Sequence, residues 1–270
     1  MRLLIFGPGY AATRLIARLA GRAEIATVTR ESFAGRAGDI ARATHILSTV
    51  PPGEEDPVLA TYGSQIAAAG AWIGYLSSTG VYGDTGGAWV DETAPMGTGR
   101  RTARARADAA WLALAGAHVF RLPGIYGPGR SPLDRIRAGT ASRIDLPGQV
   151  FSRIHVDDLV EGVIAGLAGP PGAYNLADDL PAPQSDVVAY GCALLGLPVP
   201  PAVPLEAAGL SPRARAFYAE NRRVANGKAK RVLGWRPRHA DYRLGLRALS
   251  ATTSPASTSP APPSASADQR

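Results

Sequence analysis

The first thirty residues place the strongest constraint on how this chain folds. An apolar run at residues 3–6 is followed by the hexapeptide GPGYAA at residues 7–12, an amphipathic segment at 13–20 and a second apolar segment at 24–29. The periodicity of these segments predicts a strand, a tight turn, a helix and a second strand. A G-x-G-x-x-A turn between the first strand and the helix is typical of a dinucleotide-binding βαβ unit.

The small residues of this turn each have a physical role. Gly7 permits the tight turn, Gly9 lets the backbone approach a pyrophosphate, and Ala12 lets the helix pack closely on the strand. The helix N-terminus, next to Tyr10 and Ala11, presents free N–H groups and the positive end of its dipole to a phosphate. We therefore predict that these five residues bind a cofactor.

Arg30 ends the second predicted strand and bears on the choice of cofactor. A carboxylate at this place would bind the adenosine ribose hydroxyls, whereas a guanidinium with Thr29 beside it suits a 2′-phosphate. Arg22 or Arg36 would add further positive charge. We expect NADP as the cofactor, with NAD as the alternative. The competing interpretation is that Arg30 is an ordinary exposed arginine.

The rest of the first half alternates between strand and helix patterns. Strands are predicted at residues 44–50, 72–77 and 117–122, and helices at 56–69 and 98–115. This alternation predicts an α/β fold with a doubly wound, mostly parallel sheet of the Rossmann type. The segment between Arg30 and Thr44 has room for one crossover connection, so we expect a shortened sheet whose usual third strand is lost or vestigial.

The domain organisation follows from the composition of the second half. We predict a nucleotide-binding domain at residues 1–169 and a small mixed α/β lobe at 170–249, with a helix near 184–196 and a basic helical stretch at 212–233. The substrate would bind between the two. Residues 250–270 contain Ser, Thr, Pro and Ala with almost no apolar bulk, so we expect a disordered tail.

Composition limits the compartment and the partners. Cys192 is the one cysteine, which leaves no internal disulfide and favours a reducing, cytoplasmic location. The N-terminal apolar run is too short for a signal peptide or a membrane span. The net charge of +7 comes from scattered arginines, so we expect a small-molecule substrate rather than nucleic acid or membrane, and a monomer or homodimer.

Four motifs occur in a fixed order along the chain: GPGYAA at 7–12, YLSSTGVYGD at 75–84 with VDET at 90–93, RLPGIYGPGR at 121–130, and RIHVDDLVEGV at 153–163. With these motifs the chain resembles the extended or atypical short-chain dehydrogenase/reductase superfamily, specifically the NAD(P)-dependent epimerase/dehydratase group. Later segments at 174–179, 217–235 and 242–249 resemble an uncharacterised atypical subgroup. The resemblance implies a nicotinamide cofactor.

The resemblance also implies a catalytic serine or threonine, a tyrosine and a lysine. Ser78 matches the serine position, and its place at the end of a predicted central strand points it to the ligand crevice. Thr79 is a neighbouring candidate. A hydroxyl that merely caps the backbone is the alternative interpretation of Ser78.

The tyrosine and lysine of the family are missing. Counted back from Asp108, their positions fall on Arg100 and Arg104, and arginine stays charged at any working pH. Arg104 would still hold a ribose or phosphate as a fixed cation. Tyr82 is the nearest phenol in the sequence and a candidate replacement proton donor.

Two further contacts and one helix start complete the candidate site. Pro51 and Pro123 directly follow predicted strands and are candidate cofactor contacts. Asp157 or Asp158 is predicted to cap a helix at 159–167.

The histidines at 45, 118, 155 and 239 form no pair with ligand spacing, so we expect no metal. Phe151 stands where nucleotide-sugar enzymes of the family carry a diphosphate-binding arginine, with Arg153 as a possible substitute. These departures count against a nucleotide-sugar substrate.

Two functions remain open at this stage. The first is an NADP-dependent oxidoreductase or epimerase that acts on a small hydroxyl or carbonyl compound through Ser78 and an unusual proton donor. The second is a non-catalytic NADP-binding sensor or regulatory protein. The glycine turn supports both. The arginines at positions 100 and 104 favour the second, whereas Ser78 and the loop at 126–129 favour the first, and we expect an enzyme.

Overall fold

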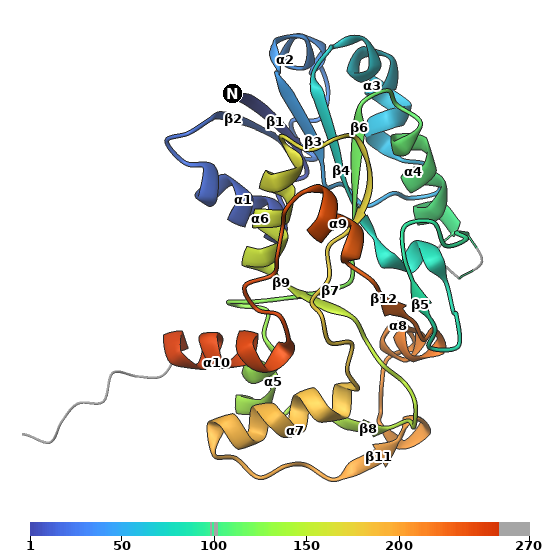
Figure 1. Cartoon of the computed structure of the whole chain (residues 1–270), viewed down its shortest axis with the longest axis vertical. Coiled ribbons are helices and arrows are strands. Elements are labelled where there is room, and N and C mark those ends of the chain that lie inside the picture. Colours follow the sequence, from blue (N-terminus) through green and yellow to red (C-terminus); the bar gives the residue numbers. More distant parts are fainter. Residues whose placement is uncertain (98, 100–101, 254–270) are drawn as a thin grey trace, which may run out of the picture.

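The computed structural model describes residues 1–97, 99 and 102–253, and its centre is a six-stranded sheet (Figure 1). In spatial order the strands are β10 (Gly172–Asn175), β6 (Ala117–Leu122), β4 (Trp72–Ser78), β3 (His45–Ser48), β1 (Arg2–Phe6) and β2 (Glu24–Val28). Every neighbouring pair is parallel. The predicted Rossmann-type α/β fold is confirmed.

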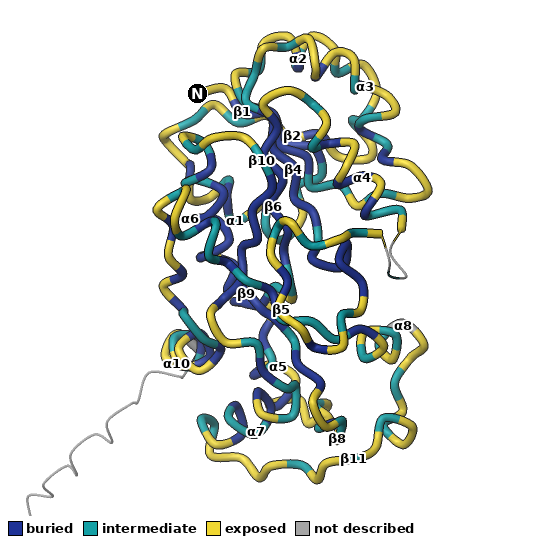
Figure 2. Tube along the Cα trace, turned by 45° about the vertical axis from the view of Figure 1, so that its right-hand side comes forward, coloured by how far each residue is buried: buried dark blue, intermediate teal, exposed yellow. Residues whose placement is uncertain are grey.

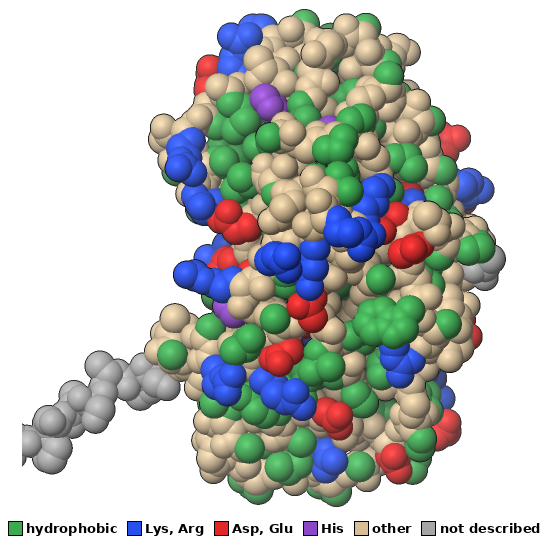
Figure 3. Space-filling view, viewed as in Figure 1, with side chains coloured by type: hydrophobic (Ala, Val, Ile, Leu, Met, Phe, Trp, Pro, Cys, Tyr) green, Lys and Arg blue, Asp and Glu red, His purple; other side chains and the backbone are tan. Residues whose placement is uncertain are grey.

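Alternating side chains of β1 fill two separate cores. Leu3 and Ile5 belong to one core, and Leu4 and Phe6 to the other, as expected for a strand covered on both faces. The first core lies under α1 (Tyr10–Leu19) and α6 (Val156–Gly166), and the second under α2 (Ala37–Arg42), α3 (Pro57–Ala68) and α4 (Thr102–Leu112). Figure 2 shows the buried strands between helices whose outer sides are exposed. On the face seen in Figure 3, lysine and arginine side chains form several separate groups with acidic side chains between them.

The edge of the sheet lacks a strand, in agreement with the sequence-based expectation. β2 is the outermost strand on its side, and α2 alone connects it to β3. Within the described residues no strand pairs with the outer edge of β2. The short connection between Arg30 and Thr44 therefore sets the width of the sheet.

A buried carboxylate fixes the start of α3 and ties it to α4. Oδ1 of Asp56 accepts hydrogen bonds from the backbone N–H groups of Val58 and Leu59, both at 3.0 Å, and Pro57 occupies the first helical position. The second carboxylate oxygen accepts from the indole N–H of Trp111 at 2.9 Å. One acidic side chain thus positions both helices.

The lobe at the foot of Figure 1 draws on several parts of the chain. It comprises α5 (Pro132–Arg137), β8 (Arg143–Asp145), α7 (Gln184–Leu195), β11 (Ala202–Pro204), the short helix η2 (Leu205–Ala207) and α10 (Tyr242–Thr253). Its core is a cluster of apolar side chains from α5, α7 and α10 that includes buried Cys192. β8 and β11 pair in parallel.

The division of the chain differs from the single boundary predicted at residues 169 and 170. β10 lies beyond that boundary and yet forms the far edge of the large sheet, paired with β6. α5 and β8 precede the boundary and yet belong to the lobe. Because parallel pairing requires a crossover, the chain returns to the sheet after its excursion through the lobe.

The basic stretch at 212–233 is not one helix, which corrects the sequence interpretation. It contains α8 (Pro212–Arg215), η3 (Ala216–Ala219), β12 (Arg223–Val224) and α9 (Gly227–Val232). β12 pairs with β5 (Trp89–Val90), and the carbonyl of Asn221 accepts from the N–H groups of Thr85 and Gly87. Pairing with a distant loop has replaced helical hydrogen bonds here.

Three remaining features complete the description. β7 (Gly124–Tyr126) and β9 (Arg153–His155) form a parallel pair below the sheet, and η1 (Thr79–Tyr82) follows β4. α10 continues to Thr253, past the expected end of the lobe at residue 249, and the rest of the predicted tail lies outside the described residues. None of the helices that the structure describes combines the length and the apolar character needed to cross a bilayer.

Candidate active site

The turn after β1 requires glycine at its first position. Gly7 has φ +77°, and a Cβ there would lie 2.9 Å from Cγ2 of Val50. The carbonyl of Gly7 accepts a hydrogen bond from the hydroxyl of Thr49, at the end of the adjacent strand β3. The backbone of the turn is therefore held close to the loop after β3, which contains the exposed candidate Pro51.

The N-terminus of α1 has no side-chain cap, because Gly9 occupies the capping position. By contrast, side chains cap α3, α5 and α6. The first N–H groups of a helix, here those of Tyr10, Ala11 and Ala12, have no partner within the helix. Such an end fits the phosphates of a dinucleotide.

Arg30 is exposed just beyond β2, but an acidic neighbour shares this place. The hydroxyl of Thr29 donates to Oε2 of Glu31 at 2.6 Å, and this hydrogen bond is the main reason that the pKa of Glu31 is lowered. Glu31 was not singled out from the sequence. Arg36, a suggested helper, is held by Asp39 at 3.0 Å.

Ser78 ends β4 and caps η1. Its Oγ accepts a hydrogen bond from the N–H of Gly80 at 3.1 Å, so the capping interpretation holds. A hydroxyl has one proton to donate besides its acceptor sites, and that proton remains for a substrate oxygen. Thr79 is buried, with its hydroxyl 3.5 Å from the carbonyl of Leu122, and is therefore less accessible than Ser78.

Behind Ser78 lies a buried ion pair that the sequence did not reveal. Asp108 on α4 and Arg121 on β6 are almost fully enclosed, and the guanidinium holds both carboxylate oxygens, the shortest contact being 2.8 Å. The hydroxyl of Ser77 donates to the same carboxylate at 2.5 Å. The pair joins α4, β4 and β6 and satisfies the polar groups of each.

Tyr82 belongs to this buried network, which corrects its assignment as a proton donor. Its hydroxyl donates to Oδ1 of Asn175 at 2.8 Å and accepts from Arg121 at 3.0 Å. The side chain is buried, and burial raises the pKa of Tyr82 to about 12 in spite of the nearby guanidinium. Its phenol is occupied inside the protein and does not face a substrate.

Of the two positions at which the family's tyrosine and lysine are missing, the structure describes only position 104. Arg100 lies outside the described residues. Arg104 is half-buried in the first turn of α4 and close enough to Tyr75 to act on the pKa of that phenol. Of the two lysines, Lys228 donates to the carbonyl of Ala173, and Lys230 pairs with Asp179. The partners of both lysines thus lie away from the end of β4.

The structure brings together three metal-ligand side chains that lie far apart in the sequence: His155, Asp158 and His239. The oxygens of Asp158 already accept from the N–H of Arg238 at 2.7 Å and from the N–H and Nδ1 of His239 at 2.9 and 2.8 Å. A carboxylate so occupied serves as a structural joint between α6 and the segment before α10.

His155 is the cap of α6, so the prediction that Asp157 or Asp158 caps this helix is wrong. Nδ1 of His155 accepts from the N–H of Asp157 at 3.2 Å, which uses the lone pair that a metal would need on that nitrogen. Burial, with His239 next to it, lowers the pKa of His155 to about 4.

Arg153 does not substitute for the diphosphate-binding arginine of the family. Its guanidinium is buried and donates to the carbonyls of Phe151 and Ala182, at 2.7 and 2.8 Å, and to the amide oxygen of Gln184. It therefore joins β9 to the lobe. Pro123, at the end of β6, is half-buried and remains a candidate cofactor contact.

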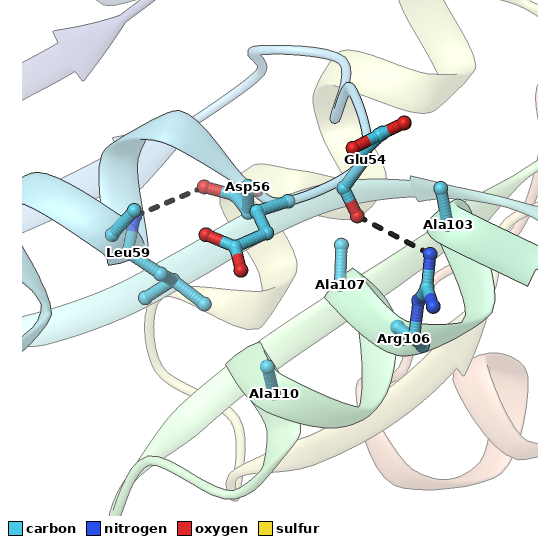
Figure 4. A pocket seen from close by; sticks show the side chains of 9 residues that line it. Glu54, Asp56, Leu59, Ala103, Arg106, Ala107 and Ala110 are labelled. Atoms are coloured by element: carbon cyan, nitrogen blue, oxygen red, sulfur yellow. Dashed lines mark hydrogen bonds between the residues drawn. The ribbon is translucent and has the colours of Figure 1, made fainter.

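A cavity of about 640 Å³ opens between the start of α3 and α4 (Figure 4). Alanines of α4 form one wall, and Arg106 is turned to the carbonyl of Glu54 at 3.3 Å. None of the candidate site residues lines it. Glu54, Glu55 and Arg106 also line it, and the candidate residues at the carboxyl edge of the sheet lie outside it.

Comparison with known proteins defines the class of fold. The human epimerase family protein SDR39U1 with NADPH is 18% identical with a TM-score of 0.72, over 93% of this chain and 99% of that chain. A dTDP-glucose 4,6-dehydratase from Bacillus anthracis with NAD is 16% identical, also with a TM-score of 0.72, over 93% and 96%. The fold is that of NAD(P)-dependent epimerases and dehydratases. No family model matches the sequence.

Two other proteins are more similar in sequence, and the first of them defines the family. A functionally unknown conserved protein from Silicibacter pomeroyi DSS is 44% identical with a TM-score of 0.83, over 93% of this chain and 98% of that chain. A 3-diazoavenalumate denitrifying reductase of a Streptomyces species is 33% identical over 141 residues, 47% of this chain and 45% of the reductase. The chain belongs to one family with the Silicibacter protein. Its fold is the one that the resemblance to the extended short-chain dehydrogenase/reductases predicts.

Proposed function

We propose that this chain is an NADP-dependent oxidoreductase or epimerase-like enzyme that acts on a small hydroxyl or carbonyl compound. The observation that supports this most is the turn after β1, where Gly7 has φ +77° and α1 begins without a side-chain cap. Arg30, exposed beyond the neighbouring strand, supports NADP. This cofactor, when bound, supplies or accepts a hydride.

Ser78 is the residue that we assign to orienting the substrate. It lies at the carboxyl end of the central strand β4, where ligands of doubly wound folds bind, and its hydroxyl proton is free to be donated. Since Tyr82 is buried and arginine stands at position 104, we assign any proton transfer to bound water and expect slow turnover.

A second acceptor class fits the same residues. The Streptomyces relative is named a denitrifying reductase of a diazo compound. Replacing a diazonium group by hydrogen consumes one hydride and releases dinitrogen, so charge balances without a proton from the protein. Such an acceptor suits a site with arginine at both positions of the family's proton-transfer pair.

Cofactor titration tests the first half of this proposal. We expect NADPH to bind at least about tenfold tighter than NADH, because the 2′-phosphate gains a charge-assisted contact with Arg30. Arg30→Asp should remove this preference, while Arg247→Asp, an equal charge change at an exposed position of α10, should keep it. Equal affinities in the unmodified protein, measured by nicotinamide fluorescence, would contradict the assignment of NADP.

A non-catalytic NADP-binding sensor is the second candidate. The observation that favours it is the enclosure of Tyr82 and Asp108, which places polar groups near Ser78 in structural bonds. Single-turnover oxidation of NADPH, with a panel of carbonyl compounds and an arenediazonium salt, separates the two functions. Tight NADPH binding with no turnover of either acceptor class would favour the sensor.

A further inference from the structure

The loop between β7 and α5 contacts the N-terminus of α1, although the two segments are far apart in the sequence. The hydroxyl of Tyr10 donates to the carbonyl of Pro128 at 3.0 Å. The guanidinium carbon of Arg130 lies 5.7 Å from the centroid of the Tyr10 ring. Gly127 and Arg130 exchange backbone hydrogen bonds of 3.4 and 3.0 Å, which close the loop on itself. Tyr10 therefore holds this loop beside the glycine turn.

Close packing fixes the position of the loop. A Cβ on Gly127 would lie 2.6 Å from both the hydroxyl of Tyr10 and Cγ1 of Val156, the first residue of α6. Ser131 follows the loop and caps α5, where Asp134 completes a capping box. Arg130 is thus anchored on both sides while its own side chain is exposed.

The charges around Tyr10 favour an anion. Burial raises the pKa of Tyr10, whereas Arg14, which hydrogen-bonds its side chain, and Arg130 both lower it. Among the main influences on this phenol, Asp157 is the carboxylate. Within the described part of the chain, Arg130 has no carboxylate at ion-pair distance. Two cations thus outweigh one anion next to an uncapped helix end.

We propose that Arg130 binds the pyrophosphate of the dinucleotide, with the Tyr10 ring as the platform that holds its guanidinium. The inference rests on the proposed function, because it needs a dinucleotide at the turn after β1. That turn offers only backbone groups, and Pro8 removes one N–H donor from it. A guanidinium supplies the missing charge with two parallel donors.

This role differs from that of Arg30 in a way that fragments of the cofactor can reveal. ADP-ribose carries the pyrophosphate without a 2′-phosphate, and 2′-AMP carries a 2′-phosphate without a pyrophosphate. Arg130→Ala should weaken ADP-ribose, NADH and NADPH by about tenfold each and leave 2′-AMP unchanged. Arg30→Ala should weaken NADPH and 2′-AMP and leave ADP-ribose and NADH unchanged.

Isothermal titration of the full chain gives these affinities, with two further variants. Arg18→Ala is the control. Arg18 lies on α1, the helix that begins with Tyr10, and its exposed side chain pairs with Glu161 at 2.6 Å. The Arg18→Ala variant should bind every probe like the unmodified protein. Arg130→Lys should regain part of the ADP-ribose affinity, since it keeps the charge and loses the paired donors.

The outcomes separate this inference from the proposed function. If Arg130→Ala binds ADP-ribose like the unmodified protein while Arg30→Ala still weakens NADPH, the role of Arg130 is overturned and the proposed function stands. If the unmodified protein binds neither dinucleotide, both are overturned. An unchanged melting temperature for Arg130→Ala shows that any lost affinity is not lost folding.

Discussion

The turn after β1 and the end of β4 meet the same edge of the parallel sheet, yet the protein treats them in opposite ways. At the turn, Gly7 and Gly9 leave backbone N–H groups without side-chain partners. At the end of β4, the hydroxyl of Ser77 donates a hydrogen bond to buried Asp108, and the hydroxyl of Tyr82 accepts one from buried Arg121. One region is open for a ligand, and the other is closed by its own side chains.

The difference shows that binding and catalysis depend on different parts of this fold. Phosphate binding needs backbone geometry, which survives changes of neighbouring side chains as long as the glycines remain. Proton transfer needs particular side chains at particular places, and here Arg104 and buried Tyr82 do not supply them. The proposed cofactor site therefore depends on fewer side chains than the proposed reaction does.

The largest effect is expected at the buried ion pair. Asp108→Ala leaves the guanidinium of Arg121 enclosed without its countercharge, and we expect a loss of about 3–5 kcal/mol of unfolding free energy. Urea unfolding followed by circular dichroism measures it. Asp134→Ala, which removes an exposed capping carboxylate, is the control, with about 1 kcal/mol expected. Similar losses of unfolding free energy in both variants would show that the Asp108–Arg121 pair is not a buried, stabilising contact.

Ser78 tests whether the closed region still has an open catalytic group. With any substrate that is turned over, Ser78→Ala should lower the single-turnover rate about 100-fold or more, because it removes the hydroxyl that orients the reacting oxygen. The affinity for NADPH should stay the same, since the phosphates are assigned to the turn after β1. Full activity in Ser78→Ala would show that the assigned site is wrong.

Gly7 tests the open region directly. Gly7→Ala forces a side chain into the left-handed region and within 2.9 Å of Val50, so NADPH affinity should fall about 100-fold, or roughly 2.7 kcal/mol. Gly21→Ala is a matched control, because Gly21 has φ +74° and no atom within 4 Å of the added Cβ. If both variants bind NADPH equally well, the turn does not hold the phosphates.

Acid should lower the stability of the fold through His155, the cap of α6. The pKa of His155 is about 4 in the folded protein and near 6.5 when unfolded, so the unfolded chain takes up the proton first. Stability is therefore full above pH 6.5 and falls as the pH drops toward 4. Between pH 7.5 and 5.0 we expect a loss of about 2 kcal/mol. His155→Asn should remove most of this loss, and His45→Asn should remove a smaller part, because burial also lowers the pKa of half-exposed His45.

The smallest effect is expected from shortening the chain. A protein that ends at Thr253 keeps all of α10, including buried Leu249, and should match the full chain in melting temperature and NADPH affinity. Ending it at Ser250 instead removes the last turn of α10 and should lower the melting temperature slightly. A clear loss from the first truncation would show that residues beyond 253 contribute to the fold.

The sequence by itself determined the sheet and the turn after β1. A continuous apolar run such as Leu3 to Phe6 has one stable placement, in a strand covered on both faces, and Gly7 marks a conformation that other residues avoid. The short link between Arg30 and Thr44 likewise predicted the missing strand. These features depend on neighbours in the chain, so local pattern was enough.

Only the tertiary structure decided which polar side chains are available. Tyr82 is enclosed by Asn175 and Arg121, His155 rather than an aspartate caps α6, and Arg130 reaches Tyr10 across the molecule. Each of these facts depends on residues far apart in the sequence that fold together. Burial decides whether a phenol, an imidazole or a guanidinium is a reactive group or a structural one, and burial is a property of the whole fold.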